Sequence, residues 1–99
     1  MPRIIAGTRK SLLLETPKKD GVRPTYDRTK ESLFNIVDSR YPYQGQIVLD
    51  IFSGTGSIGL EFLSRGAQKA VFIDKDISIT KKNVVKCKFQ DEAVIIKSD

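Results

Sequence analysis

The stretch that decides the fold runs from Val48 to Glu61 and reads VLDIFSGTGSIGLE. An apolar run comes first, glycines follow at 54, 56 and 59, and the last of them lies in a helix-forming segment. Glycine lets the backbone turn tightly and approach a ligand, and a glycine on the helix lets it pack closely on the strand. The Gly-x-Gly-x-x-Gly spacing between strand and helix therefore predicts an α/β, Rossmann-like fold with a ligand at the turn.

Asp50 stands four residues before the first of these glycines and indicates which ligand the turn suits. A carboxylate at this point repels the pyrophosphate of a dinucleotide, whereas it attracts the ammonium and sulfonium groups of S-adenosylmethionine. The sequence therefore favours S-adenosylmethionine over NAD(P). The alternative is that Asp50 only caps a turn or pairs with a lysine.

The rest of the chain predicts strands and helices in alternation. The expected strands are 46–50, 70–73 and 93–96, and the expected helices are 28–39, 57–65 and 76–89. This order predicts a βαβαβ unit with a parallel sheet, whose strands are apolar because helices cover both faces. Ahead of it, residues 3–14 predict two short strands around Gly7, and a loop spans 16–25. Asp76 is expected to cap the last helix.

Each expected strand is followed by, or ends in, an acid, and these acids are Asp50, Asp74 and Asp99. Ligands of open parallel sheets bind at the carboxyl ends of the strands, so the three carboxylates are expected to share one edge. Asp74 lies 20 residues after Gly54, the spacing at which an acid binds ribose hydroxyls. Asp99 is expected to accept a hydrogen bond from an adenine amino group, and the backbone of 52–57 to meet the carboxylate end of the ligand.

The composition limits the class of protein and the kinds of site that the chain can form. The chain has 99 residues, of which 39% are hydrophobic and 29% charged, as is typical of one small globular domain. No apolar run is long enough to span a membrane, and the lone Cys87 fits a reducing cytoplasm. The sequence has no histidine, which excludes histidine acid–base catalysis and the common zinc sites, so no metal is expected.

The net charge of +5 is unevenly placed along the chain. Residues 1–44 hold nine of the 17 Lys and Arg but five of the 12 Asp and Glu, so they carry +4 of it. A basic excess ahead of the glycine turn favours a polyanion partner, nucleic acid above all. The alternative is a basic surface that is merely solvated.

Four segments together resemble one family of enzymes. They are LDIFSGTGSIGLE at 49–61, LSRGA at 63–67, VFIDKD at 71–76 and RPTYDRTKESLFNI at 23–36. The first three resemble Rossmann-type S-adenosylmethionine methyltransferases, and the last narrows the resemblance to the bacterial 16S rRNA guanine-N2 methyltransferase family (RsmD-like). The resemblance covers essentially the whole chain. It implies methyl transfer from S-adenosylmethionine to an exocyclic guanine amine of small-subunit rRNA, in the cytoplasm.

The resemblance also implies roles for particular residues. The cofactor pocket would be lined by Asp50, Ser53, Gly54, Gly56, Asp74 and Asp99. The mouth of the site, where cofactor or RNA phosphate is met, would hold Arg23, Thr25 and Arg28. For the two arginines the alternative is a local ion pair with Asp20, Asp27 or Glu31. Asn83 is expected to hold a neighbouring loop through hydrogen bonds rather than to contact the ligand.

Two regions follow from the resemblance. Residues 1–25 would form an N-terminal β-hairpin and basic loop, with Arg3, Arg9 and Lys10 on an RNA-facing extension. Residues 26–99 would form the N-terminal half of the S-adenosylmethionine-binding domain, which is expected to end after the third core strand.

Members of the family continue through a fourth strand to an Asn/Asp-Pro-Pro-Tyr loop that holds the target base. This sequence has no such motif, so no catalytic residue is assigned. The chain is therefore expected to supply the cofactor-binding half of the enzyme. The alternative is a catalytically inactive fragment that binds cofactor or RNA.

Overall fold

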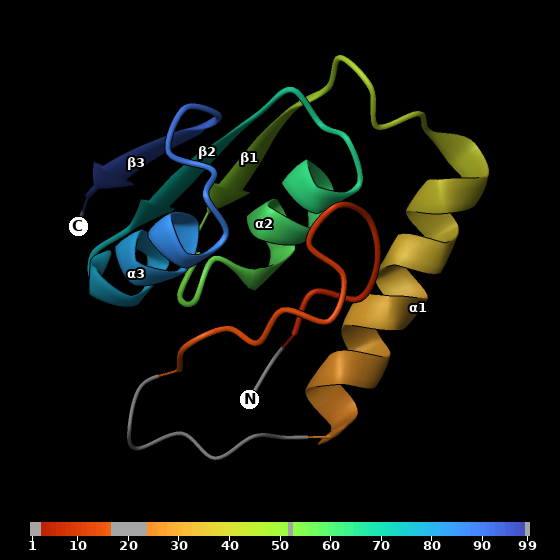
Figure 1. The fold of residues 1–99 in the computed structure, drawn as a ribbon, viewed down its shortest axis with the longest axis horizontal. Coiled ribbons are helices and arrows are strands. Elements are labelled where there is room, and N and C mark those ends of the chain that lie inside the picture. Colours follow the sequence, from red (N-terminus) through yellow and green to blue (C-terminus); the bar gives the residue numbers. More distant parts are fainter. Residues whose placement is uncertain (1–2, 17–23, 52, 99) are drawn as a thin grey trace.

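A parallel sheet of three strands lies at the centre of the chain, in the order β1-β2-β3. The structure is a computed structural model that describes residues 3–16, 24–51 and 53–98. Its elements are α1 (Pro24–Arg40), β1 (Ile47–Ile51), α2 (Ser57–Ser64), β2 (Lys69–Asp74), α3 (Ser78–Lys86) and β3 (Ala93–Lys97). The predicted βαβαβ order is thus confirmed, and Figure 1 shows α1 beside this unit. None of the helices in these ranges has the length and apolar character needed to cross a membrane.

One face of the sheet carries the hydrophobic core. Asp50 is in register with Phe72, and Phe72 with Ile95, so these residues point to the same side of the parallel sheet. Phe72 and its neighbour on this side, Ala70, are fully buried. In Figure 1, α2 and α3 lie over this side, and both helices contribute apolar residues to the core.

The opposite face of the sheet is open, which corrects the expectation that helices cover both faces. Ile47, Leu49 and Ile51 of β1 are 65%, 58% and 54% exposed, and Val94 and Ile96 of β3 continue this open apolar face. The reason lies in the strand order. Because β1, β2 and β3 follow one another across the sheet and crossovers share one hand, α2 and α3 both fall on the same side.

The N-terminal hairpin is reduced to a single antiparallel bridge between Arg3 and Leu13, so the expectation of two short strands is wrong for the described part of this segment. The backbone explains why. The N–H groups of Ile5 and Ala6 donate to the carboxylate of Glu61 (2.8 and 3.0 Å), so they are not available to a facing strand. The segment 3–16 packs on α2 instead.

Side chains of this N-terminal segment belong to the same core as the sheet. Ile4 and Leu14 are fully buried in the cluster that includes Leu60. Arg9 reaches across to the end of α3, where its Nε donates to the Cys87 carbonyl (2.6 Å) and its guanidinium lies 4.2 Å from the centre of the Phe89 ring. This arginine therefore holds the fold together, whereas Lys10 and Arg3 are exposed.

Helices α1 and α3 have boundaries that differ from the sequence prediction. Helix α1 begins at Pro24 rather than at residue 28, because proline lacks an N–H and its fixed φ suits the first turn of a helix. Helix α3 begins at Ser78 rather than at Asp76, whose Oδ1 accepts hydrogen bonds from the N–H and hydroxyl of Ser78 (3.1 and 2.8 Å). It also ends early, since Lys88 adopts a positive φ of 59° and turns the chain.

Candidate functional site

Residues 53–56 form the turn between β1 and α2, at the carboxyl edge of the sheet. The N–H of Ser53 donates to the Ile73 carbonyl (3.2 Å), which extends the contact of β1 with β2. The N–H of Gly56 donates to the Ser53 carbonyl (2.8 Å) and closes the turn. Gly54 and Gly56 both have positive φ, 57° and 81°, which glycine adopts without strain. We call residues 53–56 the glycine turn.

Asp50 and Gly59 meet where α2 crosses the sheet. A Cβ on Gly59 would lie 2.4 Å from the ring of Phe72, so glycine is required for the close packing of α2 on β2, as expected. The N–H of Gly59 donates to Oδ2 of Asp50 (3.0 Å). Burial raises the pKa of Asp50, the hydrogen bond from Gly59 opposes this, and the nearby Asp74 carboxylate raises the pKa further.

Asp74 reaches from the end of β2 to the glycine turn. Its Oδ2 accepts the N–H of Gly54 (2.8 Å) and its Oδ1 accepts the N–H of Lys75 (2.7 Å). These hydrogen bonds, that from Gly54 most strongly, lower the pKa of Asp74, so the carboxylate is ionised at neutral pH. The fold thus brings Asp50, the glycine turn and Asp74 together at one edge, as the sequence predicted.

Helix α3 holds the glycine turn from the other side. The hydroxyl of Thr80 donates to the Gly54 carbonyl (2.7 Å) and lies 3.1 Å from the Ser53 hydroxyl, which therefore points into the protein. Asn83 Nδ2 donates to the Thr55 carbonyl (2.8 Å). The prediction that Asn83 holds a neighbouring loop is confirmed. Thr80 was missed, because five other polar residues lie on the same short helix and nothing local in the sequence sets it apart from them.

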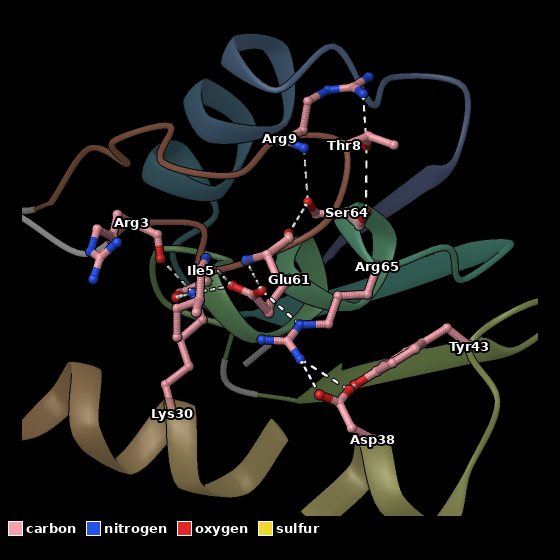
Figure 2. Close-up of polar contacts among 12 residues, drawn as sticks. Arg3, Ile5, Thr8, Arg9, Lys30, Asp38, Tyr43, Glu61, Ser64 and Arg65 are labelled. Carbon is pink, nitrogen blue, oxygen red and sulfur yellow. Dashed lines mark hydrogen bonds and ion pairs between the residues drawn. The ribbon is translucent and has the colours of Figure 1, made fainter. Parts of the chain in front are cut away.

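A buried ion cluster anchors the start of α2, and Figure 2 shows Glu61 at its centre. The side chains of Lys30 and Glu61 are 1% and 0% exposed, with 3.0 Å between Lys30 Nζ and Glu61 Oε1. Lys30 also donates to the Ser57 hydroxyl (2.7 Å) and to the Arg3 carbonyl (2.9 Å). Because Ser57 directly follows the glycine turn, the cluster ties the turn to α1 and to the N-terminal segment.

Arg65, at the C-terminal end of α2, completes the ion cluster (Figure 2). Its Nε donates to Glu61 Oε2 (2.8 Å), and its Nη1 donates to both oxygens of Asp38 (3.0 Å each). Burial by itself would raise the pKa of Glu61, but the bonds from Ile5, Arg65 and Lys30 together lower it. The sequence did not indicate this cluster, because charged residues far apart in a chain are normally read as surface.

The sequence profile of the family described as Conserved hypothetical protein 95 matches residues 2–99. The chain belongs to this family.

Relatives of this Conserved hypothetical protein 95 family member include proteins named Ribosomal RNA small subunit methyltransferase D. The one from Haemophilus influenzae is 42% identical over 101 residues, and the match covers 97% of this chain and 51% of the relative. The one from Escherichia coli K12 is 40% identical over 85 residues, covering 81% of this chain and 39% of the relative. The chain therefore spans about half the length, or less, of these relatives.

Solved structures agree with the family placement. The Escherichia coli protein yhhF superposes with a TM-score of 0.81 at 37% identity, covering 99% of this chain and 53% of that one. The hypothetical protein TTHA0928 from Thermus thermophilus gives the same TM-score at 31% identity and covers 99% of this chain and 56% of that one. The family member described here thus has the Rossmann-like fold that the sequence predicted.

Four predicted site residues remain: Asp99, Arg23, Thr25 and Arg28. Asp99 and Arg23 lie outside the described residues, and Thr25 lies in the first turn of α1. Arg28 is exposed on α1 and makes no ion pair within the part of the chain whose side chains the structure describes, so a pair with Glu31 is not formed. In the same part of the chain, no three His, Cys, Asp or Glu side chains are grouped as a metal site.

Proposed function

We propose that the chain binds S-adenosylmethionine at the carboxyl edge of the sheet. The observation that carries this proposal is that two carboxylates lie beside the glycine turn. Asp74 accepts a hydrogen bond from the N–H of Gly54 in the turn, and Asp50 accepts one from the N–H of Gly59 in the helix that follows. Two acids at one edge suit a ligand with cationic groups and sugar hydroxyls better than a pyrophosphate. The glycine turn also leaves room for the cofactor, because a Cβ on Gly54 would meet no atom within 4 Å.

The roles of the residues follow from their places along this edge. Asp50 would face the ammonium group of the ligand and Asp74 the ribose hydroxyls. Asp99 would accept from the adenine amino group, while the backbone of Ser53, Gly54 and Gly56 would border the amino-acid end. The rim would be formed by Arg23, Thr25 and Arg28. Bound here, S-adenosylmethionine supplies an electrophilic methyl group.

For the whole protein we propose methylation of an exocyclic guanine amine (N2) in small-subunit rRNA, in the cytoplasm. The names of the relatives support rRNA as substrate, and the basic excess of residues 1–44 suits a polyanion. This chain spans about half the length of those relatives, so we assign it the cofactor-binding part of the reaction. In this part of the reaction the chain would hold and orient the cofactor. Orientation matters because alignment of the amine, the methyl carbon and the sulfur provides much of the rate acceleration of methyl transfer.

Calorimetric titration with S-adenosylhomocysteine tests the cofactor site. The variant Asp74→Asn keeps the shape of the side chain but removes its charge. We expect it to weaken binding at least about tenfold, the loss typical of a hydrogen bond to a charged group. Asp91→Asn, an exposed residue in the loop before β3, is the matched control and should bind like the wild type. Equal binding by Asp74→Asn, or preferential binding of NAD, would contradict the proposal.

A second candidate is a binding module without turnover. In this candidate, Asp50, Asp74 and the glycine turn would hold the cofactor, and the basic excess of residues 1–44 would contact RNA. An assay of methyl transfer to 16S rRNA separates the two candidates. Saturable cofactor binding without transfer would support the module, and transfer by this chain alone would exclude it.

A further inference from the structure

Two buried polar residues of α3 support the glycine turn from behind. Thr80 and Asn83 lie about one helical turn apart and are both 0% exposed. Thr80 Oγ1 donates to the Gly54 carbonyl (2.7 Å), and Asn83 Nδ2 donates to the Thr55 carbonyl (2.8 Å). Since neither side chain is open to a ligand, any effect on binding must act through the backbone that they hold.

Asn83 also joins the glycine turn to the N-terminal segment. Its Oδ1 accepts the N–H of Glu15 (2.7 Å), and its Nδ2 donates to the Glu15 carbonyl (3.0 Å) as well as to Thr55. Both donors of the amide and its acceptor oxygen are therefore in use. A buried amide with all these bonds made holds its partners firmly, because breaking any one leaves a buried polar group unpaired.

The carbonyl contacts fix the direction of an N–H group in the turn. In a trans peptide the C=O and the N–H point in opposite directions. Holding the Gly54 carbonyl against α3 therefore turns the N–H of Thr55 away from α3. Within the described residues this N–H meets no hydrogen-bond acceptor, whereas the N–H of Gly56 is bonded to Ser53.

We infer that Thr80 and Asn83 are positioning residues for the cofactor site. They hold the glycine turn so that the N–H of Thr55 is directed outward, where it donates to the carboxylate of the amino-acid end of the ligand. The inference rests on the proposed function, since it concerns the preparation of the same site. It adds that affinity for the cofactor depends on a side-chain hydroxyl and an amide that never touch it.

The test compares two substitutions of Thr80 that remove different halves of the side chain. Thr80→Val keeps the shape and removes the hydroxyl donor. Thr80→Ser keeps the donor and removes the methyl group, which lies 3.3 Å from the position of a Cβ on Gly56. A packing role predicts damage from serine, whereas a positioning role predicts damage from valine. Asn83→Asp removes both amide donors, and Asn35→Asp, exposed on α1, controls for the added charge.

Two quantities are measured for each folded variant: the dissociation constant for S-adenosylhomocysteine, and the amide exchange rates of Gly54 and Gly56 without ligand. We expect Thr80→Val and Asn83→Asp to weaken binding about tenfold, the order of one orienting hydrogen bond, and to speed exchange. Thr80→Ser and Asn35→Asp should stay within about threefold of the wild type on the same scale.

The outcomes separate this inference from the proposed function. If the wild type binds and Thr80→Val binds equally well, or Thr80→Ser loses as much as Thr80→Val, the inference is overturned and the cofactor site stands. If the wild type does not bind, the proposed function fails for this chain. The exchange rates then decide: faster exchange in Thr80→Val but not in Thr80→Ser supports the positioning role, and unchanged rates overturn it.

Discussion

Glu61 carries all of its charge inside the protein, where Lys30, Arg65 and two backbone N–H groups surround it. Removing one partner of a buried ion pair leaves the other without compensation. We therefore expect Glu61→Gln to lower the free energy of unfolding by about 3 kcal/mol, the size typical of a broken buried pair. Urea unfolding measures this, with Glu31→Gln, exposed on α1, as the control. A loss no greater than that of the control would show that the cluster does not stabilise the fold.

The same carboxylate gives stability a pH dependence of known sign. The pKa of Glu61 in the folded chain lies below its ordinary value of 4.5. Such a group stabilises the fold fully above the unfolded pKa, and this contribution is lost as the pH falls through the folded pKa. Unfolding experiments from pH 6 downward should therefore show a loss of stability that begins near the ordinary value. Glu61→Gln should lack this part of the loss, and an identical pH profile would contradict the assignment.

At the scale of elements, the N-terminal segment is fixed to α2 by a close contact at Gly7. A Cβ there would lie 1.9 Å from the Ser64 carbonyl oxygen, and the φ of Gly7 is +88°. Gly45 has a similar φ of +80° but open space around the position of its Cβ. We expect Gly45→Ala to cost about 1 kcal/mol for backbone strain alone, and Gly7→Ala clearly more, about 3 kcal/mol, because a clash is added. Thermal and urea unfolding compare them, and equal losses would mean that the contact with Ser64 is unimportant.

The sequence predicted the elements and the site edge, but not the ion cluster. Apolar runs and glycine spacing are local signals, so β1, the glycine turn and Asp74 were all found from them. Lys30 and Glu61 are 31 residues apart and each looks like a surface charge in its own helix; only packing brings them together. The open face was missed for a related reason, since an apolar strand reads the same whether one or two of its faces are covered.

At the scale of the whole molecule, the open apolar face predicts self-association. Large exposed apolar areas on a sheet favour contact with another chain, and β1 is also an edge strand. Leu49→Lys, in the middle of β1, should shift the chain toward monomer in sedimentation velocity experiments. Leu33→Lys, 41% exposed on α1, is the matched control and should leave association unchanged. A wild-type chain that sediments as a monomer up to high concentration would refute this expectation.

The packing of residues 3–16 against α2 and the end of α3 also has a consequence for the synthesis of the protein. Ile4, Leu14 and Arg9 find their partners on α2 and just beyond α3, and Arg9 and Cys87 are 78 residues apart in the chain. A ribosome that adds 5–20 residues per second needs roughly 4 to 16 seconds to cover that distance. Residues 4–14 are therefore synthesised before their partners at the end of α3, and the contact of Arg9 with Cys87 forms only after Cys87 has been added to the chain.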